Sequence, residues 1–129
     1  MQIKFSDNTT LDVLNVNGQA AYYQGANRDS LEFQFAKSAY GFDQLEGIFA
    51  DESKTAQITI LDDAAQYLHE NYCLRMKMEL RPVEITPASG STPAVTDERI
   101  CITMAQKTYA EIQMKTMQDT VDMLVLSSL

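Results

Sequence analysis

The sequence predicts an α+β fold that is mainly antiparallel β-sheet, curled into a sandwich or partial barrel, with a short covering helix and a C-terminal helix. Three observations lead to this class. Apolar and polar residues alternate over several short segments, as in half-buried strands. Apolar residues recur at helical spacing between residues 42 and 50. Beyond residue 107 the apolar period changes to that of a heptad.

The first third of the chain predicts a series of short antiparallel strands. They cover residues 3–5, 11–16, 19–24 and 31–35. Asn17-Gly18 predicts the turn of a hairpin, since both residue types tolerate the positive φ angles of a type I′ turn. Residues 25–29 contain further turn formers and separate the third strand from the fourth.

The covering helix is predicted near residues 42–50, because Phe42, Leu45 and Phe49 share one helical face. Such a helix closes an open end of the sheet. A strand marked by Ile58 and Ile60 is expected after it.

Alternation is longest in the segment Leu68–Leu80. The side chains that point one way are Tyr72, Leu74, Met76, Met78 and Leu80. This pattern predicts one long antiparallel strand with a buried and a hydrated face. A helix over Asp62–Tyr72 is the alternative, since its residues tolerate helix. Residues 86–97 are rich in Pro, Gly, Ser and Thr and predict a flexible loop at a hairpin tip, and residues 100–104 form the returning strand.

Residues 107–129 predict an amphipathic C-terminal helix that follows a β-rich domain of residues 1–106. Its apolar stripe, here called the seam, steps by four, three, four and three residues through Ala110, Met114, Met117, Val121 and Leu124. The seam either packs on the sheet of its own chain or binds a partner. The positions that flank it are nearly free of charge, so that partner choice would depend on packing: they are Glu111, Gln113, Gln118, Thr120, Val125 and Ser127.

The end of this helix favours a partner. One intramolecular face does not bury a full circumference of the helix, yet apolar residues surround its end: Met123, Leu124, Val125, Leu126 and Leu129. Each such side chain left in water forgoes roughly 1.5–3 kcal/mol of transfer free energy. The predicted partner interface therefore comprises Ala110, Met114, Met117, Val121, Met123, Leu124, Val125 and Leu126.

Composition excludes several classes of partner. At 129 residues with 45% apolar content, the chain is expected to form one domain with its own core. A formal charge of −8 and the lack of a Lys/Arg cluster argue against nucleic acid and anionic membranes. No apolar run reaches the roughly 18 residues of a membrane span, and the N-terminus lacks the pattern of a signal peptide. We therefore expect synthesis in the cytoplasm, with Cys73 and Cys101 as buried free thiols.

The residue types that carry catalysis occur without suitable spacing. His69 lies four residues from Cys73 on an apparent strand, roughly 13 Å along the chain and too far for a nucleophile–base pair. Asp51-Glu52 and Asp62-Asp63 are adjacent carboxylates, which suit solvated turns better than hydrolysis or calcium binding. The sequence predicts neither an enzyme nor a cofactor or metal site.

A binding module remains an alternative function. Tyr22, Tyr23 and the loop Thr86–Asp97 are the residues that would contact a small ligand or a glycan. Paired tyrosines in a strand, however, more often belong to the core.

Several segments carry a family resemblance. They are Met1–Leu11, Phe42–Phe49 with Asp51, Gln57–Leu61, His69–Tyr72 and Met104–Glu111. In these segments the chain resembles small proteins encoded in the tail modules of Firmicute prophages and siphophages. The resemblance implies a β-rich head with a C-terminal helix or coiled coil, and a non-enzymatic structural or accessory role in the tail or baseplate region. It also implies self-association or another tail protein as partner, association with the virion, and no catalytic residues.

Overall fold

The computed structural model describes the backbone of residues 1–127 and the side chains of residues 1–118, 120 and 121. The predicted fold class is confirmed: the strands form two antiparallel four-stranded sheets. The first sheet has the order β2-β1-β5-β6, with β1 (Gln2–Lys4), β2 (Thr10–Asp12), β5 (Gln57–Asp62) and β6 (Ala65–Glu70). The second has the order β3-β4-β8-β7, with β3 (Asn15–Tyr23), β4 (Ala26–Ala36), β7 (Leu74–Thr86) and β8 (Val95–Ala105).

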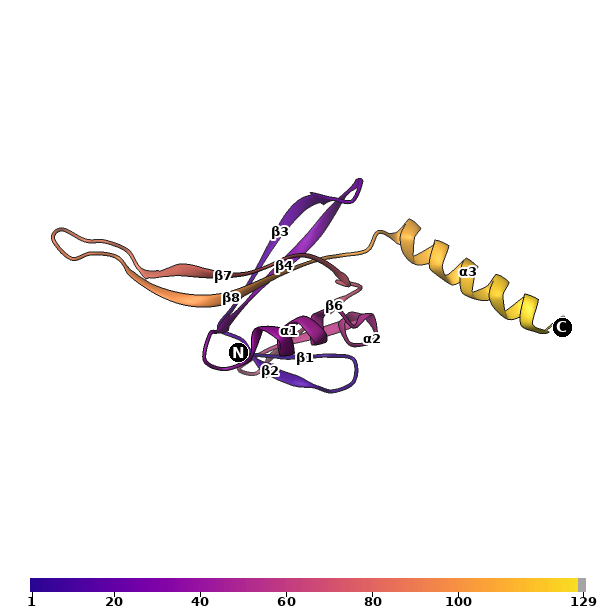
Figure 1. Cartoon of the computed structure of the whole chain (residues 1–129), viewed down its shortest axis with the longest axis horizontal. Helices are drawn as coiled ribbons and strands as arrows, with labels where there is room; N and C mark the ends of the chain where they lie inside the picture. The colour runs from indigo at the N-terminus through magenta and orange to yellow at the C-terminus, as the bar shows by residue number, and fades with distance from the viewer. Residues whose placement is uncertain (128–129) are drawn as a thin grey trace.

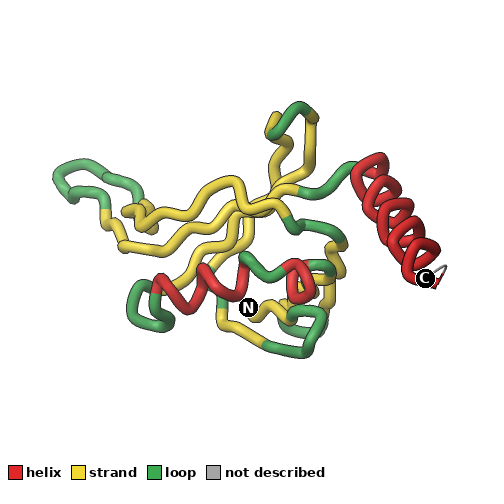
Figure 2. Tube along the Cα trace, turned by 45° about the vertical axis from the view of Figure 1, so that its right-hand side comes forward, coloured by secondary structure: helices red, strands yellow, loops and turns green. Residues whose placement is uncertain are grey.

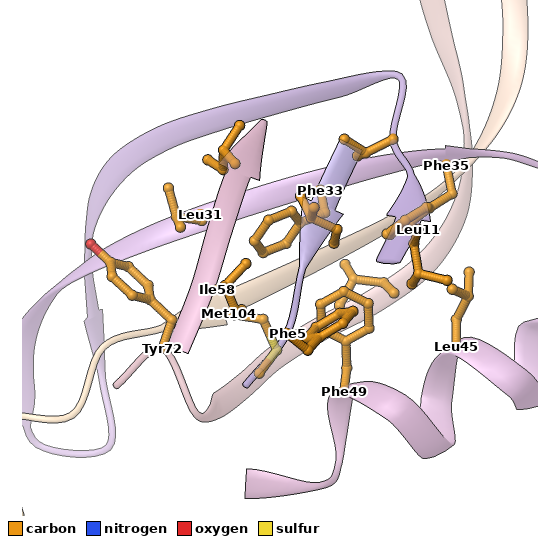
Figure 3. Packing of buried hydrophobic residues seen from close by; sticks show 14 of the residues in the cluster. Phe5, Leu11, Leu31, Phe33, Phe35, Leu45, Phe49, Ile58, Tyr72 and Met104 are labelled. Carbon is orange, nitrogen blue, oxygen red and sulfur yellow. The ribbon is translucent and has the colours of Figure 1, made fainter. Parts of the chain in front are cut away.

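One hydrophobic core lies between the two sheets and α1 (Phe42–Phe49), as Figure 3 shows. Phe49 lies at its centre and is fully buried. Its ring centroid is 5.4 Å from that of Phe5, 5.5 Å from that of Phe33 and 5.8 Å from that of Phe35. Phe33 and Phe35 belong to β4 of the second sheet and Phe5 directly follows β1 of the first, so α1 covers the core between them and its predicted covering role is confirmed.

The sequence predicted one of the two helices between residues 42 and 55 and missed the other. Leu45 and Phe49 of α1 are buried, but Phe42 is 42% exposed, so its predicted place on the core face is wrong. A second helix, α2 (Glu52–Thr55), was not predicted. Its first turn is capped by Asp51, which accepts a hydrogen bond of 3.0 Å from the amide of Ser53.

The predicted turn at Asn17-Gly18 is wrong. Both residues lie inside β3, which pairs with β4 over its whole length and places Val16 opposite Phe33. The hairpin turns at Gln24-Gly25 instead, where the φ angles of +47° and +79° are those of a type I′ turn. Pairing along all of β3 satisfies more backbone groups than a turn at residue 17 would allow, and this decides the outcome.

The predicted long strand Leu68–Leu80 is also wrong. The chain breaks at Asn71, whose φ is +65°, and the two parts belong to different sheets as β6 and β7. The alternative helix over residues 62–72 is wrong as well, because β6 occupies most of that range. Met78 packs against the core, whereas Leu80 is 48% exposed because β7 continues past the body of the molecule.

Figures 1 and 2 show that, besides the tip of the β3–β4 hairpin, two segments extend from the body, the name used here for residues 1–105 without the end of the β7–β8 hairpin. The first is that hairpin end. In this hairpin β7 ends at Thr86 and β8 begins at Val95, so the loop between them is shorter than the predicted loop 86–97. The flexibility of this loop stays a prediction. The second is α3 (Tyr109–Ser127), the predicted C-terminal helix, which points away from both sheets.

Candidate functional site

The chain enters α3 through a junction that is bonded to both sheets. The amide of Gln106 donates to the carbonyl of Asp29 in the second sheet at 2.9 Å. The amide of Lys107 donates to the carbonyl of Asn71 at 2.8 Å, and the Gln106 side chain donates to the carbonyl of Glu70 at 3.0 Å. Asn71 and Glu70 are at the end of the first sheet. The body therefore sets the position from which α3 starts.

The first turn of α3 forms a capping box between Thr108 and Glu111. The amide of Glu111 donates to Thr108 Oγ1 at 3.2 Å, and the amide of Thr108 donates to Glu111 Oε1 at 2.9 Å. Each side chain thus satisfies a backbone donor that the helix leaves unpaired at its start. This local signal defines where the helix begins.

Glu111 also binds Arg28, whose side chain is 1% exposed. The guanidinium contacts both carboxylate oxygens, with Nη2 3.1 Å from Oε2, and donates to the carbonyls of Tyr23 and Gln106 at 2.8 and 3.2 Å. The hydrogen bonds from Arg28 and from the Thr108 amide lower the pKa of Glu111 from 4.5 to about 2. A buried arginine of β4 therefore has its counter-ion in α3.

A second contact joins α3 to α2 through Glu52. The Glu52 carboxylate lies 3.1 Å from Lys107 Nζ and 3.5 Å from Lys115 Nζ. The hydrogen bond from Lys107 lowers the pKa of Glu52. Lys115 is one turn beyond Glu111, so the two contacts together fix the rotation of the helix about its axis.

This rotation turns the described part of the seam toward solvent. The side of α3 that faces α2 carries Ile112, Lys115 and Thr116, which line a hollow with Glu52, Ser53 and Ala56. At about 100° per residue, the seam lies on the opposite side of the helix. Met114 is 70% exposed, Met117 66% and Val121 52%, and Ala110 is exposed as well. The described seam therefore does not pack on its own sheet.

The structure thus brings together Ala110, Met114, Met117 and Val121 of the predicted interface on one exposed face. The side chains of Met123, Leu124, Val125 and Leu126 lie outside the described residues. Sequence reasoning missed Arg28 and Glu52, which orient the helix from a distance. A Thr followed three residues later by Glu is the sequence pattern of a capping box, and it occurs at Thr108 and Glu111. This pattern could have predicted the start of the helix, but it does not indicate the ion pair to Arg28.

The residues considered for catalysis have structural surroundings. Asp51 caps α2, and Glu52 is paired with two lysines. The ring of His69 packs edge-on against Tyr72 at 5.6 Å, and burial lowers the pKa of the imidazole. Cys101 is buried as predicted, whereas Cys73 is half-buried. Within the described residues, no three His, Cys, Asp or Glu side chains gather where a metal ion would bind.

The residues of the ligand-binding alternative lie apart. Tyr22 and Tyr23 are next to the turn of the β3–β4 hairpin, and the loop between β7 and β8 is at the tip of a different hairpin (Figure 1). Tyr22 is 72% exposed, whereas the Tyr23 hydroxyl donates to the carbonyl of Arg75 at 3.3 Å. The structure does not join them into one surface.

Two further findings bear on function. None of the helices in the described part of the chain combines the length and the apolar character that a membrane crossing requires. No protein-family model, curated protein or solved structure matches the chain.

Proposed function

We propose that the chain is a non-enzymatic structural protein of a phage or prophage tail, made in the bacterial cytoplasm and incorporated into the virion, which assembles through α3. The observation that carries this proposal is the outward orientation of the seam. Two polar contacts, Arg28–Glu111 and Glu52–Lys115, turn the apolar side of the helix away from the body. A helix that only covered its own sheet would have the opposite orientation.

A second copy of the chain is the partner that the seam fits best, with another tail protein as the other outcome. The described side chains next to the seam, such as Gln113 and Thr120, are uncharged except for Glu111, which is paired with Arg28, while Lys115 lies on the side toward α2. Two identical helices therefore meet without like charges at the contact, although each chain carries a charge of −8. Removing Met114, Met117 and Val121 from water supplies the driving force.

The strength of this contact is expected to be modest. A helix of 19 residues contains fewer than three heptads, and an isolated coiled coil of that length is weak. We expect a dissociation constant of roughly micromolar or weaker for two free chains. In a tail, many copies held side by side would raise the effective concentration.

Sedimentation velocity of the full chain over a range of concentrations tests the assembly role. The Met117→Glu variant is expected to associate more weakly than the natural chain, because a carboxylate would be buried in the contact that α3 makes. Tyr109→Glu is the matched control: Tyr109 is 77% exposed on α3 but lies beside the seam and not in it. Equal association of both variants and the natural chain would refute a role of the seam.

The place in a tail needs a separate test. Purified particles from the phage or lysogen that encodes the chain should contain it in a fixed ratio to the tail-tube protein, and portal or tape-measure genes should flank its gene. Its absence from particles would reject the tail role, while leaving the association through α3 to be judged from sedimentation.

A further inference from the structure

The four edge strands of the two sheets differ in how they are protected against pairing with another chain. β2 has three residues, and β6 ends in His69 and Glu70. β7 contains Pro82, five charged residues and two register shifts in its pairing with β8. Short length, proline, charge and bulges are the features with which natural sheets block their edges. The edges β2 and β7 are therefore protected, whereas β6 is shorter than β3 and has one charged residue, Glu70, at its end.

β3 is the fourth edge and lacks all these features. It has nine residues, Asn15–Tyr23, without a charge, a proline or a bulge in its pairing with β4. It lies at the end of its sheet and is exposed along most of its length. The chain has 18 acidic and 10 basic residues, and none of them lies in this edge strand. An uncharged edge of this length can form backbone hydrogen bonds with a further strand.

The turn at Gln24-Gly25 determines which backbone groups face outward. A type I′ hairpin closes on a hydrogen-bonded pair, here Tyr23 and Ala26, and every second residue of the strand then turns its amide and carbonyl away from the partner. In β3 these are the even-numbered residues from Val16 to Tyr22. The Asn15 side chain accepts from the Val16 amide at 3.0 Å, which agrees with an outward direction of that amide.

We propose that β3 pairs with β3 of a second copy, antiparallel and across a two-fold axis at Gln19. This register overlaps the two strands completely and joins outward-facing groups to outward-facing groups. It places Val16 opposite Tyr22 of the second copy, and Gly18 opposite Ala20. The two second sheets become one continuous sheet, through a surface separate from α3.

The side chains along β3 are complementary to themselves in this register. Tyr22 is 72% exposed, and in the pair it lies against Val16 of the second copy, which is half-buried at the rim of the core. Aromatic side chains opposite β-branched ones stabilise antiparallel pairs. The small residues at the centre allow the backbones to approach, and the two Gln19 side chains face each other, free to exchange amide hydrogen bonds. The Val16 amide exchanges its bond to Asn15 for a carbonyl of the second copy.

Opposite charges at the axis provide a specific test. Gln19→Glu and Gln19→Lys each place two like charges opposite each other and should weaken self-association about fivefold or more. An equimolar mixture of the two variants should restore it, because Glu then faces Lys. The same two substitutions at Gln44, an exposed residue of α1, make the same charge changes and should alter nothing. A mixture that associates no better than the separate variants overturns the proposal.

Amide hydrogen exchange in the full chain gives a second readout. With rising concentration, the amides of Ala20 and Tyr22 should become protected, whereas those of Ala21 and Tyr23 are protected by β4 at every concentration. The measurement is repeated with Met117→Glu, so that association through α3 and pairing through β3 are judged separately. Exchange of Ala20 and Tyr22 that is fast and independent of concentration in both proteins overturns the proposal.

Discussion

Replacing Glu111 with Gln removes the counter-ion of a buried arginine and leaves the shape of the site unchanged. Arg28 keeps its bonds to backbone carbonyls, but its charge loses the carboxylate that contacts it with both oxygens. Breaking a buried ion pair costs about 3–5 kcal/mol. Because the Glu111 side chain is 37% exposed, water screens part of this interaction, and we expect about 2–3 kcal/mol.

Urea denaturation followed by far-ultraviolet circular dichroism measures this loss at pH 7. The matched control is Glu46→Gln, because Glu46 and Arg75 form an exposed pair 3.6 Å apart, expected to contribute less than about 0.5 kcal/mol. If Glu111→Gln costs no more than Glu46→Gln, α3 is not held to the body by Arg28. The outward orientation of the seam would then lose its physical basis.

The same variant has a defined pH dependence. The pKa of Glu111 is about 2 in the folded chain, against a usual value of 4.5, so the contact stabilises the fold fully above pH 4.5. As pH falls from 4.5 toward 2, the carboxylate takes up a proton and the contribution is lost. The difference in unfolding free energy between the natural chain and Glu111→Gln should therefore shrink over this range. A constant difference between pH 6 and pH 2 would contradict the assignment.

Four further substitutions test the fold by thermal and urea unfolding. Phe49→Ala empties the centre of the core and should cost about 3–5 kcal/mol, whereas Phe42→Ala, at an exposed position, should cost less than about 1 kcal/mol; equal costs would contradict the packing described. Gly25→Ala should destabilise by about 1 kcal/mol because of its φ of +79°, although a methyl group there meets no neighbour. Gly47→Ala, inside α1 and also in open space, should stabilise by about 0.5–1 kcal/mol, and a loss of stability there would be unexpected.

Local patterns in the sequence predicted elements whose residues contact near neighbours. The alternation of Leu31, Phe33 and Phe35 predicted β4, and the spacing of Leu45 and Phe49 predicted α1. In each, the period of the element appears directly in the order of apolar residues. The short helix α2 was missed because four residues do not reveal a helical period.

Features of the fold that depend on contacts between residues far apart in the sequence could not be predicted from local patterns. Asn17-Gly18 and Gln24-Gly25 are both plausible turns, and the pairing of β3 with β4 over its full length decides between them. The alternation that is regular from Tyr72 to Leu80 does not reveal the break at Asn71, although β6 and β7 on either side of it belong to different sheets. The rotation of α3 depends on Arg28, which lies 83 residues away from Glu111. These three features depend on tertiary contacts, and the periodicity of apolar residues along the sequence gives no information about such contacts.

The measurement that tests the central claim most directly is the solvent accessibility of the methionine methyl groups, observed by NMR with a soluble paramagnetic agent at increasing protein concentration. Met1, 46% exposed and remote from α3 in sequence, is the exposed reference, and the fully buried Met104 is the buried one. We predict that Met114 and Met117 lose accessibility as concentration rises, while Met1 and Met104 do not change. Accessibility of Met114 and Met117 that stays as high as that of Met1 at every concentration would contradict assembly of the chain through the outward face of α3.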